Sequence, residues 1–232
     1  MNKNNEKIQK FKEIQDKLKK DIKFQALDIS KIKYVAGVDI AYCYHNNVEY
    51  GCCSIIVIDF ATLQVVEKCN HIEQITLKYI PGYLAFRELP VILNTKNKLK
   101  SNPDIFIFDG NGYLHPNNMG IATHASFYLN KPCIGVAKTY FKIDEIDFAK
   151  PKNYIGATTE IVRNKEILGL AMRSRVNYKP IFISCGNYIT LDNCKDIIQK
   201  LLTKNSRIPI PTRLADIETH KVRKDFLATC KI

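Results

Sequence analysis

Acidic residues are scarce in this chain of 232 residues. Only 23 aspartates and glutamates stand against 35 lysines and arginines, which leaves a net charge of +12. Such an excess of positive charge favours partners that are polyanions. The alternative is a merely solvated lysine-rich surface, because Lys, Asn and Ile are abundant throughout the sequence.

The sequence also lacks a C-x-x-C pair and any regular cysteine spacing, although it has eight cysteines. This absence argues against a disulfide framework and against a zinc site, since no cluster offers paired ligands. Several cysteines lie inside apolar stretches such as "GCCSIIVI" and "KPCIGVAK". We interpret them as reduced core thiols of a protein in a reducing compartment.

No run approaches the roughly 18 apolar residues of a membrane span. The lysine-rich start of the chain is not followed by the apolar segment of a signal peptide, and no repeat or low-complexity linker divides the sequence. We therefore expect a soluble intracellular monomer with no membrane partner, cytoplasmic or, in a eukaryote, also nuclear. With 46% apolar composition, residues 1–232 are expected to form one domain.

Hydrophobic periodicity predicts the elements of that domain. Apolar residues at intervals of three and four (Ile8, Phe11, Ile14, Leu18 and Ile22) predict an amphipathic helix over about 5–23, docked on the rest of the chain. Further helices are expected at 83–100, where Pro90 should kink the helix or lie in its first turns, at about 118–130, and at 192–203 with Asp192 as N-cap. Strands are expected at 33–44, 51–60, 63–76, 104–109, 131–138 and 180–190, with strand pairs within 152–174.

The connections between these elements predict the sheet. The first three strands are joined by short turns, which is typical of antiparallel neighbours. The strand "DIFIFD" is continuously apolar, as expected of a strand buried on both faces, and a helix leads from it to the next strand. The sequence therefore predicts an α/β fold with a mixed sheet, three antiparallel strands followed by parallel ones, flanked by helices.

Three carboxylates lie where apolar or turn residues are expected: Asp39 in "VAGVDIAY", Glu88 in "YLAFRELP" and Asp109 in "IFIFDGNG". A buried carboxylate costs several kcal/mol unless it is paired or binds a cation. If the strands carrying Asp39 and Asp109 are adjacent, the two can share one divalent ion. An oxygen-only ligand set favours Mg²⁺ or Mn²⁺ over zinc. The alternative is that each aspartate bonds to a nearby lysine or caps a turn.

The loop after Asp109 contains Gly110 and Gly112 but lacks the third glycine of a dinucleotide fingerprint, because His115 stands in its place. What remains is a loop whose backbone a ligand can approach closely. His115, followed by Pro116, could contact a base or a phosphate, or be a histidine with a purely structural role in a turn.

Six segments in order resemble the endonuclease V family. They are "YVAGVDIAY", "YIPGYLAFRE", "FDGNGYLHPNNMGIATH", "IGVAKTYF", "PIFISCGN" and "PIPTRLAD", and the similarity extends from about residue 33 to 220. The resemblance implies an RNase H-like core. It also implies that Asp39, Glu88 and Asp109 hold the metal ion, that Asp216 occupies a fourth catalytic position filled by Asp or His in relatives, and that Lys138 is the catalytic lysine. Taken without the family, Lys138 would be read as a surface lysine.

The same resemblance implies the reaction and the partner. Enzymes of this family nick nucleic acid at the second phosphodiester 3′ of an inosine, and Mg²⁺ chemistry leaves 3′-OH and 5′-phosphate ends. A Tyr-Ile-Pro segment, here Tyr79, Ile80 and Pro81, acts as a wedge when the base is flipped out. The flipped base would meet the loops around Gly82, Gly110, Gly112 and His115.

Two positions depart from the family pattern. Lys78 replaces the proline that usually precedes the wedge tyrosine, which loosens the wedge but adds a phosphate contact. Asn117 replaces a basic residue after "HP", which weakens a backbone contact. The expected function is DNA repair. The alternatives are a ribonuclease for inosine-containing RNA, since no motif reveals contacts to the 2′-OH, and a binding-only inosine reader, against which Lys138 and the complete carboxylate set count.

Overall fold

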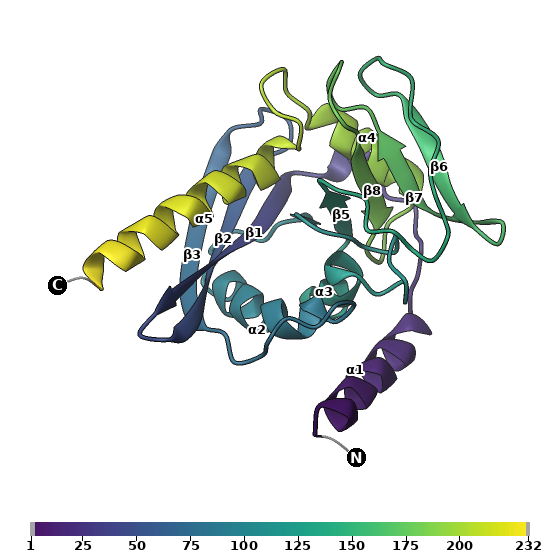
Figure 1. Cartoon of the computed structure of the whole chain (residues 1–232). Coiled ribbons are helices and arrows are strands. Elements are labelled where there is room, and N and C mark those ends of the chain that lie inside the picture. The colour runs from purple at the N-terminus through teal and green to yellow at the C-terminus, as the bar shows by residue number, and fades with distance from the viewer. Residues whose placement is uncertain (1–2, 231–232) are drawn as a thin grey trace.

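A single mixed sheet of eight strands organises the molecule in this computed structural model, which describes residues 3–230 (Figure 1). The strand order is β3-β2-β1-β4-β5-β8-β7-β6. The strands are β1 (Tyr34–His45), β2 (Val48–Asp59), β3 (Val65–Gln74), β4 (Ile105–Phe108), β5 (Cys133–Ala137), β6 (Thr158–Arg163), β7 (Glu166–Met172) and β8 (Ile181–Cys185).

The pairing of the first five strands agrees with the prediction. Strands β1, β2 and β3 are antiparallel neighbours, and β4 and β5 then join β1 in parallel. In the β1–β4 register Val38 lies opposite Phe108. The next residues along the chain are Asp39, in the middle of β1, and Asp109, directly after β4, so parallel pairing brings both carboxylates side by side where β4 ends.

Beyond β5 the sheet becomes antiparallel again, because β8 pairs with β5 in the opposite direction and β7 and β6 follow in antiparallel pairs. The sequence predicted these strands but not their direction relative to β5. Strands β6 and β7 are joined by a tight turn in which Asn164 and Lys165 both have positive φ, at 51° and 69°. Two such residues in succession are typical of the short turns that connect antiparallel strands.

Helices cover both faces of the sheet (Figure 1). On one face, α2 (Leu84–Lys96) and α3 (Ile121–Leu129) pack with β1, β2 and β4 in one apolar core that includes Val38, Ile55 and Phe106. On the other face, α4 (Leu191–Lys200) and α5 (Ile210–Thr229) pack in a second core around Val35, Ile107 and other residues. The sequence patterns predicted α2, α3 and α4 with longer bounds, and they missed α5 altogether.

The N-cap of α4 differs from expectation, whereas Pro90 lies in the first turns of α2. Helix α4 is capped by Thr190, whose hydroxyl oxygen accepts the backbone N–H of Asn193 at 3.3 Å, so Asp192 lies in the first turn and the N-cap prediction was wrong. Pro90 lies inside α2, on its exposed side. It is the seventh residue of the helix, so it lies within the first two turns, which was one of the two expectations.

The N-terminal helix α1 (Lys3–Lys19) ends four residues before the expected boundary. Its Phe11 ring stacks on Phe86 of α2 with centroids 4.0 Å apart. Ile14, expected on the apolar face, is 39% exposed, and the neighbouring Gln15 is the buried residue at 1% exposure.

All eight cysteines are free thiols; seven are buried, and Cys230, near the end of the described chain, is partly exposed. Over residues 3–230 no helix combines the length and apolarity needed to cross a membrane.

Candidate active site

Asp39 and Asp109 line a common cavity of about 230 Å³. Asp39 lies in the middle of β1 and Asp109 directly follows β4, and the parallel pairing of the two strands places them side by side. The backbone N–H of Asp109 donates to the carbonyl of Val38 at 3.3 Å. Glu88 of α2 lines the same cavity. The remaining lining residues are apolar: Val38, Ile40, Ile92, Phe108 and Ile121. The structure therefore brings together the three carboxylates that the sequence singled out.

The protein environment makes each of these carboxylates hard to ionise. Burial raises the pKa of Glu88 to about 7, and the repulsion from Asp39 adds to it, although the Tyr42 hydroxyl donates to Glu88 Oε1 at 2.6 Å and opposes the shift. Burial and repulsion from Asp109 likewise raise the pKa of Asp39. The pKa of Asp109 is raised by burial as well. A positive charge in the cavity would lower these pKa values, because it offsets both the repulsion between the carboxylates and the cost of burying their charge.

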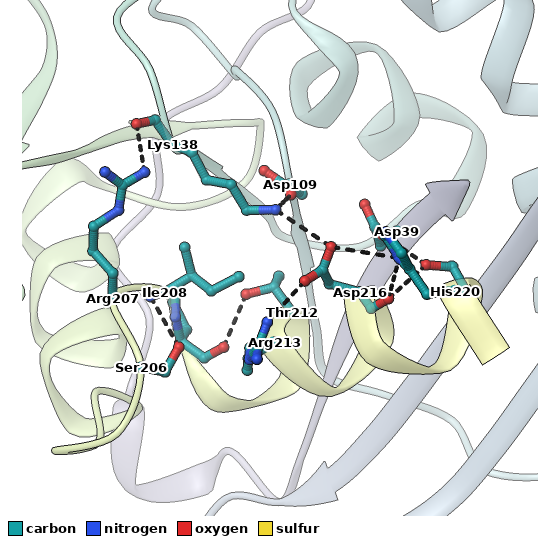
Figure 2. Close-up of polar contacts among 12 residues, drawn as sticks. Asp39, Asp109, Lys138, Ser206, Arg207, Ile208, Thr212, Arg213, Asp216 and His220 are labelled. Carbon is teal, nitrogen blue, oxygen red and sulfur yellow. Dashed lines mark hydrogen bonds and ion pairs between the residues drawn. The ribbon is translucent and has the colours of Figure 1, made fainter. Parts of the chain in front are cut away.

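Lys138, just after β5, supplies one such charge. Its Nζ lies 2.5 Å from Asp109 Oδ2 and 3.5 Å from Asp216 Oδ1 (Figure 2). Burial lowers the pKa of Lys138, but the hydrogen bond to Asp109 and the attraction of Asp109, Asp216 and Asp39 together outweigh burial, and the pKa is raised. The lysine therefore stays protonated. The pairing of Asp109 with a lysine, which was the alternative explanation of a buried aspartate, is present in addition to the shared cavity.

Asp216 reaches this cluster from α5. Arg213, one turn earlier, donates to Asp216 Oδ2 at 3.1 Å (Figure 2). Thr219 of the same helix donates to Asp39 Oδ2 at 3.0 Å. The helix can lie this close because Gly37 of β1 has no side chain. A Cβ built there would be 2.1 Å from the backbone of Pro211, so any other residue would push α5 away.

The cluster offers carboxylate oxygens as ligands to a metal ion, but its side chains are not close enough together to surround an ion. Within residues 3–230 no three carboxylate, imidazole or thiol side chains converge closely enough to enclose an ion. The donor chemistry fits a hard divalent cation, because three carboxylates with raised pKa values line one cavity and no thiol or imidazole competes there.

A second, smaller cleft of about 90 Å³ adjoins the carboxylate cavity, and Ile121 lines both. The cleft contains four of the residues expected at a base pocket: Tyr79, Gly82, Gly110 and His115. It is completed by Leu84, Ala85, Asn111, Met119, Gly120, Ile121 and Phe141. Gly82 has a φ of +83°, which glycine adopts without strain, so the loop after the Tyr-Ile-Pro segment can turn directly into α2.

Three other predicted residues do not line this cleft. Ile80 and Pro81 lie next to Tyr79 in sequence but outside the lining, and Pro81 is exposed. Gly112 is buried: a Cβ there would be 2.1 Å from the carbonyl oxygen of Cys185, and its N–H donates to Ser184 Oγ at 2.9 Å. Its missing side chain makes room for β8, so we revise the expectation that Gly112 makes room for a ligand.

His115 is a neutral hydrogen-bonding group in this cleft. Burial lowers its pKa to about 4. Its Nδ1 lies 3.2 Å from the backbone N–H of Asn117, which can only donate, so Nδ1 accepts and the ring proton is on Nε2. The ring stacks on Phe141, with centroids 5.7 Å apart. His115 can therefore donate one hydrogen bond without carrying a charge.

Gln15 of α1 forms hydrogen bonds to both sides of the cleft, and the sequence did not predict it as a site residue. Its Nε2 donates to the carbonyls of Gly82 at 3.1 Å and Met119 at 3.5 Å, and its Oε1 accepts from Asn117 Nδ2 at 3.0 Å. Asn117, which departs from the family pattern, is thus a partner of Gln15. The helical pattern assigned Ile14 to the buried face, so nothing in the sequence pointed to Gln15.

Two further residues near the site were also missed. Phe141 belongs to the segment "IGVAKTYF" but carries no feature that distinguishes it from a core aromatic. Arg207 donates to the carbonyl of Lys138 at 2.8 Å and precedes the segment "PIPTRLAD". A larger cavity of about 680 Å³ lies elsewhere, among α4, β6 and β7, and is lined by none of the predicted site residues.

The family model for endonuclease V matches residues 16–217. The chain belongs to the endonuclease V family. The endonuclease V of Bacillus thuringiensis subsp. konkukian is 52% identical over 221 residues, which are 95% of this chain and 94% of that protein. Membership makes the chain a nuclease, a hydrolase acting on phosphodiester bonds.

Solved structures of endonuclease V share the fold. That of Bacillus subtilis is 47% identical, with a TM-score of 0.92 over 99% of this chain and 95% of its own. That of Ciona intestinalis is 26% identical, with a TM-score of 0.84 over 96% and 99% of the two chains. It was determined in complex with a 24mer DNA containing an inosine followed by a ribo-adenosine. The predicted RNase H-like mixed sheet flanked by helices is confirmed by these neighbours.

Proposed function

We propose that this endonuclease nicks inosine-containing DNA in repair, in a Mg²⁺-dependent reaction at the second phosphodiester 3′ of the inosine. The observation that carries the proposal is the adjacency of two sites, a three-carboxylate cavity and a narrow cleft, which share Ile121 as a common wall. The DNA bound to the Ciona intestinalis enzyme supports the choice of substrate. Hydrolysis would leave 3′-OH and 5′-phosphate ends.

Asp39, Glu88 and Asp109 would hold the Mg²⁺, with Mn²⁺ as a substitute. When bound, the ion supplies charge that polarises a phosphate oxygen and activates water. Lys138 would contact the scissile phosphate through its ammonium group, which already lies at the cavity edge. Asp216, itself fixed by Arg213, would orient that ammonium group.

The narrow cleft would receive the flipped base. Tyr79 is 57% exposed and stands at its rim, so it is free to insert into a base stack as the tip of the Tyr-Ile-Pro wedge. The neutral His115 offers a donor to an acceptor on the base edge, and Gly82 and Gly110 leave room for it. Ile80 and Pro81 would stiffen the wedge from outside the cleft.

Strands of DNA and of RNA, each with a single inosine, test this function directly. Each is incubated with the protein in Mg²⁺ or in EDTA, beside a control strand with adenosine at the same position. We expect one cut in the inosine DNA, only with Mg²⁺, and a 5′-phosphate on the downstream fragment. Cutting that persists in EDTA would contradict the metal role, and equal cutting of the adenosine strand would contradict the base cleft. Faster cutting of the RNA strand would make the protein a ribonuclease, and tight inosine binding without cutting would make it a reader.

A further inference from the structure

A small cavity of about 180 Å³ lies beside the carboxylate cluster, and two of its lining residues, Arg207 and Ser206, have no role in the function proposed above. Three cationic side chains line it: Lys138, Arg207 and Arg213 (Figure 2). Ser206, Ile208 and Asp216 complete the lining. Three cations against a single carboxylate make this the kind of enclosure that attracts an anion.

The positive charge of Arg207 is available to such an anion. Its NH2 donates to the carbonyl of Lys138 at 2.8 Å, which fixes the side chain but does not neutralise it. Among residues 3–230 no carboxylate lies within ion-pair distance of Arg207, whereas Lys138 and Arg213 both pair with Asp216. A guanidinium group held in place with most of its N–H donors free is suited to a phosphate.

A neutral donor faces the same cavity. Ser206 is 8% exposed, and its Oγ accepts the backbone N–H of Ile208 at 3.2 Å. In the described part of the chain its hydroxyl hydrogen has no recorded acceptor. Cations together with a free hydroxyl match the phosphodiester group of a nucleic-acid backbone better than a carboxylate ligand, because a phosphate presents several acceptor oxygens in a tetrahedral arrangement.

The three cavities follow one another across the site. Ile121 joins the base cleft to the carboxylate cavity, and the Asp109–Lys138 ion pair joins the carboxylate cavity to the Arg207 cavity. The base cleft and the Arg207 cavity share no lining residue. A strand that leaves the base cleft in the 3′ direction and passes the carboxylates therefore meets the Arg207 cavity next.

We infer that Arg207, with Ser206 and Arg213, forms a binding site for the backbone phosphate immediately 3′ of the scissile one. The inference rests on the proposed function for the direction of the strand. The site would hold the downstream fragment in register while the bond beside Lys138 is cut.

The test combines Arg207→Gln, which keeps an amide donor but removes the charge, with strands in which one phosphate at a time is replaced by an uncharged methylphosphonate. Dissociation constants are measured in EDTA, so that no cutting occurs. We expect the variant to bind the inosine strand with roughly tenfold weaker affinity.

Wild type should lose affinity to a similar extent when the phosphate next to the scissile one on its 3′ side is a methylphosphonate. The variant should lose no further affinity on that same strand. The slope of log affinity against log salt should fall by about one in the variant.

Controls separate the site from a general loss of charge or fold. Arg207→Lys keeps the charge and should keep the salt slope, and Arg175→Ala removes an arginine that lies over Tyr178, with affinity expected unchanged. A methylphosphonate scan of the wild type that is flat over the 3′ positions would overturn the inference even if Arg207→Gln does not fold. If the protein did not distinguish inosine from adenosine, the proposed function would be refuted instead. The salt dependence of binding to an ordinary single strand, compared between wild type and Arg207→Gln, would still test the phosphate site.

Discussion

Tyr79 is the residue that we expect to separate a flipped base from the stack. A large aromatic residue that is 57% exposed loses apolar burial, yet this one stands at the rim of a narrow cleft rather than on an isolated surface. An exposed aromatic beside a cleft can replace the stacking that a flipped base leaves behind. The contribution of Tyr79 to the cutting rate should therefore depend on whether the inosine is stacked in a duplex.

We predict that Tyr79→Ala slows cutting of duplex inosine DNA roughly tenfold to a hundredfold and of a single strand much less, because stacking is worth about 1–3 kcal/mol per base. Single-turnover rates on matched duplex and single-stranded substrates measure the difference. Tyr154→Ala removes a similarly exposed tyrosine, at 59%, that does not line the cleft, and should leave both rates unchanged. Equal losses on the two substrates would argue against a wedge.

The sequence identified those site residues whose chemistry conflicts with their surroundings. Asp39, Glu88 and Asp109 were predictable because a carboxylate among apolar residues needs a partner. Gln15 and Arg207 were not, because a glutamine and an arginine among lysines look like ordinary surface residues. Only the folded chain reveals that Gln15 is buried and that Arg207 has no carboxylate partner among residues 3–230.

At the scale of elements, the cleft depends on an attachment between α1 and two loops. Gln15 connects the helix to Gly82, which ends the wedge segment, and to Asn117 and Met119 in the loop after β4. These segments are far apart in sequence and have no other common support from α1 through side-chain hydrogen bonds among the described residues. The helix therefore helps to fix the width of the cleft.

A double-mutant cycle with Gln15→Leu and Asn117→Leu tests this attachment. We expect a coupling free energy of about 1 kcal/mol in urea unfolding, and a larger rise in KM for inosine strands than fall in kcat, because the cleft loosens while the carboxylates stay in place. Gln9→Leu on the exposed side of α1 removes a hydrogen bond from Gln9 to Glu13 at 2.9 Å and should change stability by less than about 0.5 kcal/mol. Additive free energies in the cycle would mean that the two side chains act independently.

The elements themselves were largely predictable, and their relative directions less so. Short turns predicted the antiparallel start, and a helical crossover predicted that β4 and β5 are parallel. The antiparallel return of β8 was not predictable, because no local pattern records which neighbour a strand will choose. The sequence patterns did not predict helix α5, which begins just after Pro209 and has Pro211 in its first turn.

For the whole molecule, titration of buried groups couples stability to pH in opposite directions. The pKa of His124 is lowered by burial to about 4, and neither ring nitrogen has a hydrogen-bond partner in the described structure. Between pH 6.5 and 4 His124 binds a proton in the unfolded chain but stays neutral in the folded protein, so the free energy of unfolding falls as pH falls. Glu88, whose pKa is raised to about 7, has the opposite effect, because its folded form takes up the proton first.

Because these contributions oppose each other, a comparison of variants is more informative than one stability curve. We predict that His124→Phe, which fits beside Phe86 and Tyr128, gains about 2 kcal/mol of unfolding free energy relative to wild type between pH 7.5 and 5. Urea unfolding at both pH values measures the gain. A difference between the two proteins that stays constant with pH would show that His124 does not stay neutral when folded.

The net charge of +12 gives the whole molecule an attraction for either nucleic acid, so affinity alone says little about the site. The proposed function depends instead on hydrolysis at the three-carboxylate cavity. The most direct measurement compares cutting and binding of an inosine strand by Asp109→Asn and by Asp196→Asn, which changes an exposed aspartate of α4. We predict that Asp109→Asn loses at least about a hundredfold in cutting rate while its affinity in EDTA is kept or improved, because a negative charge has been removed, and that Asp196→Asn is unaffected. An Asp109→Asn variant that cuts at the wild-type rate would contradict the account.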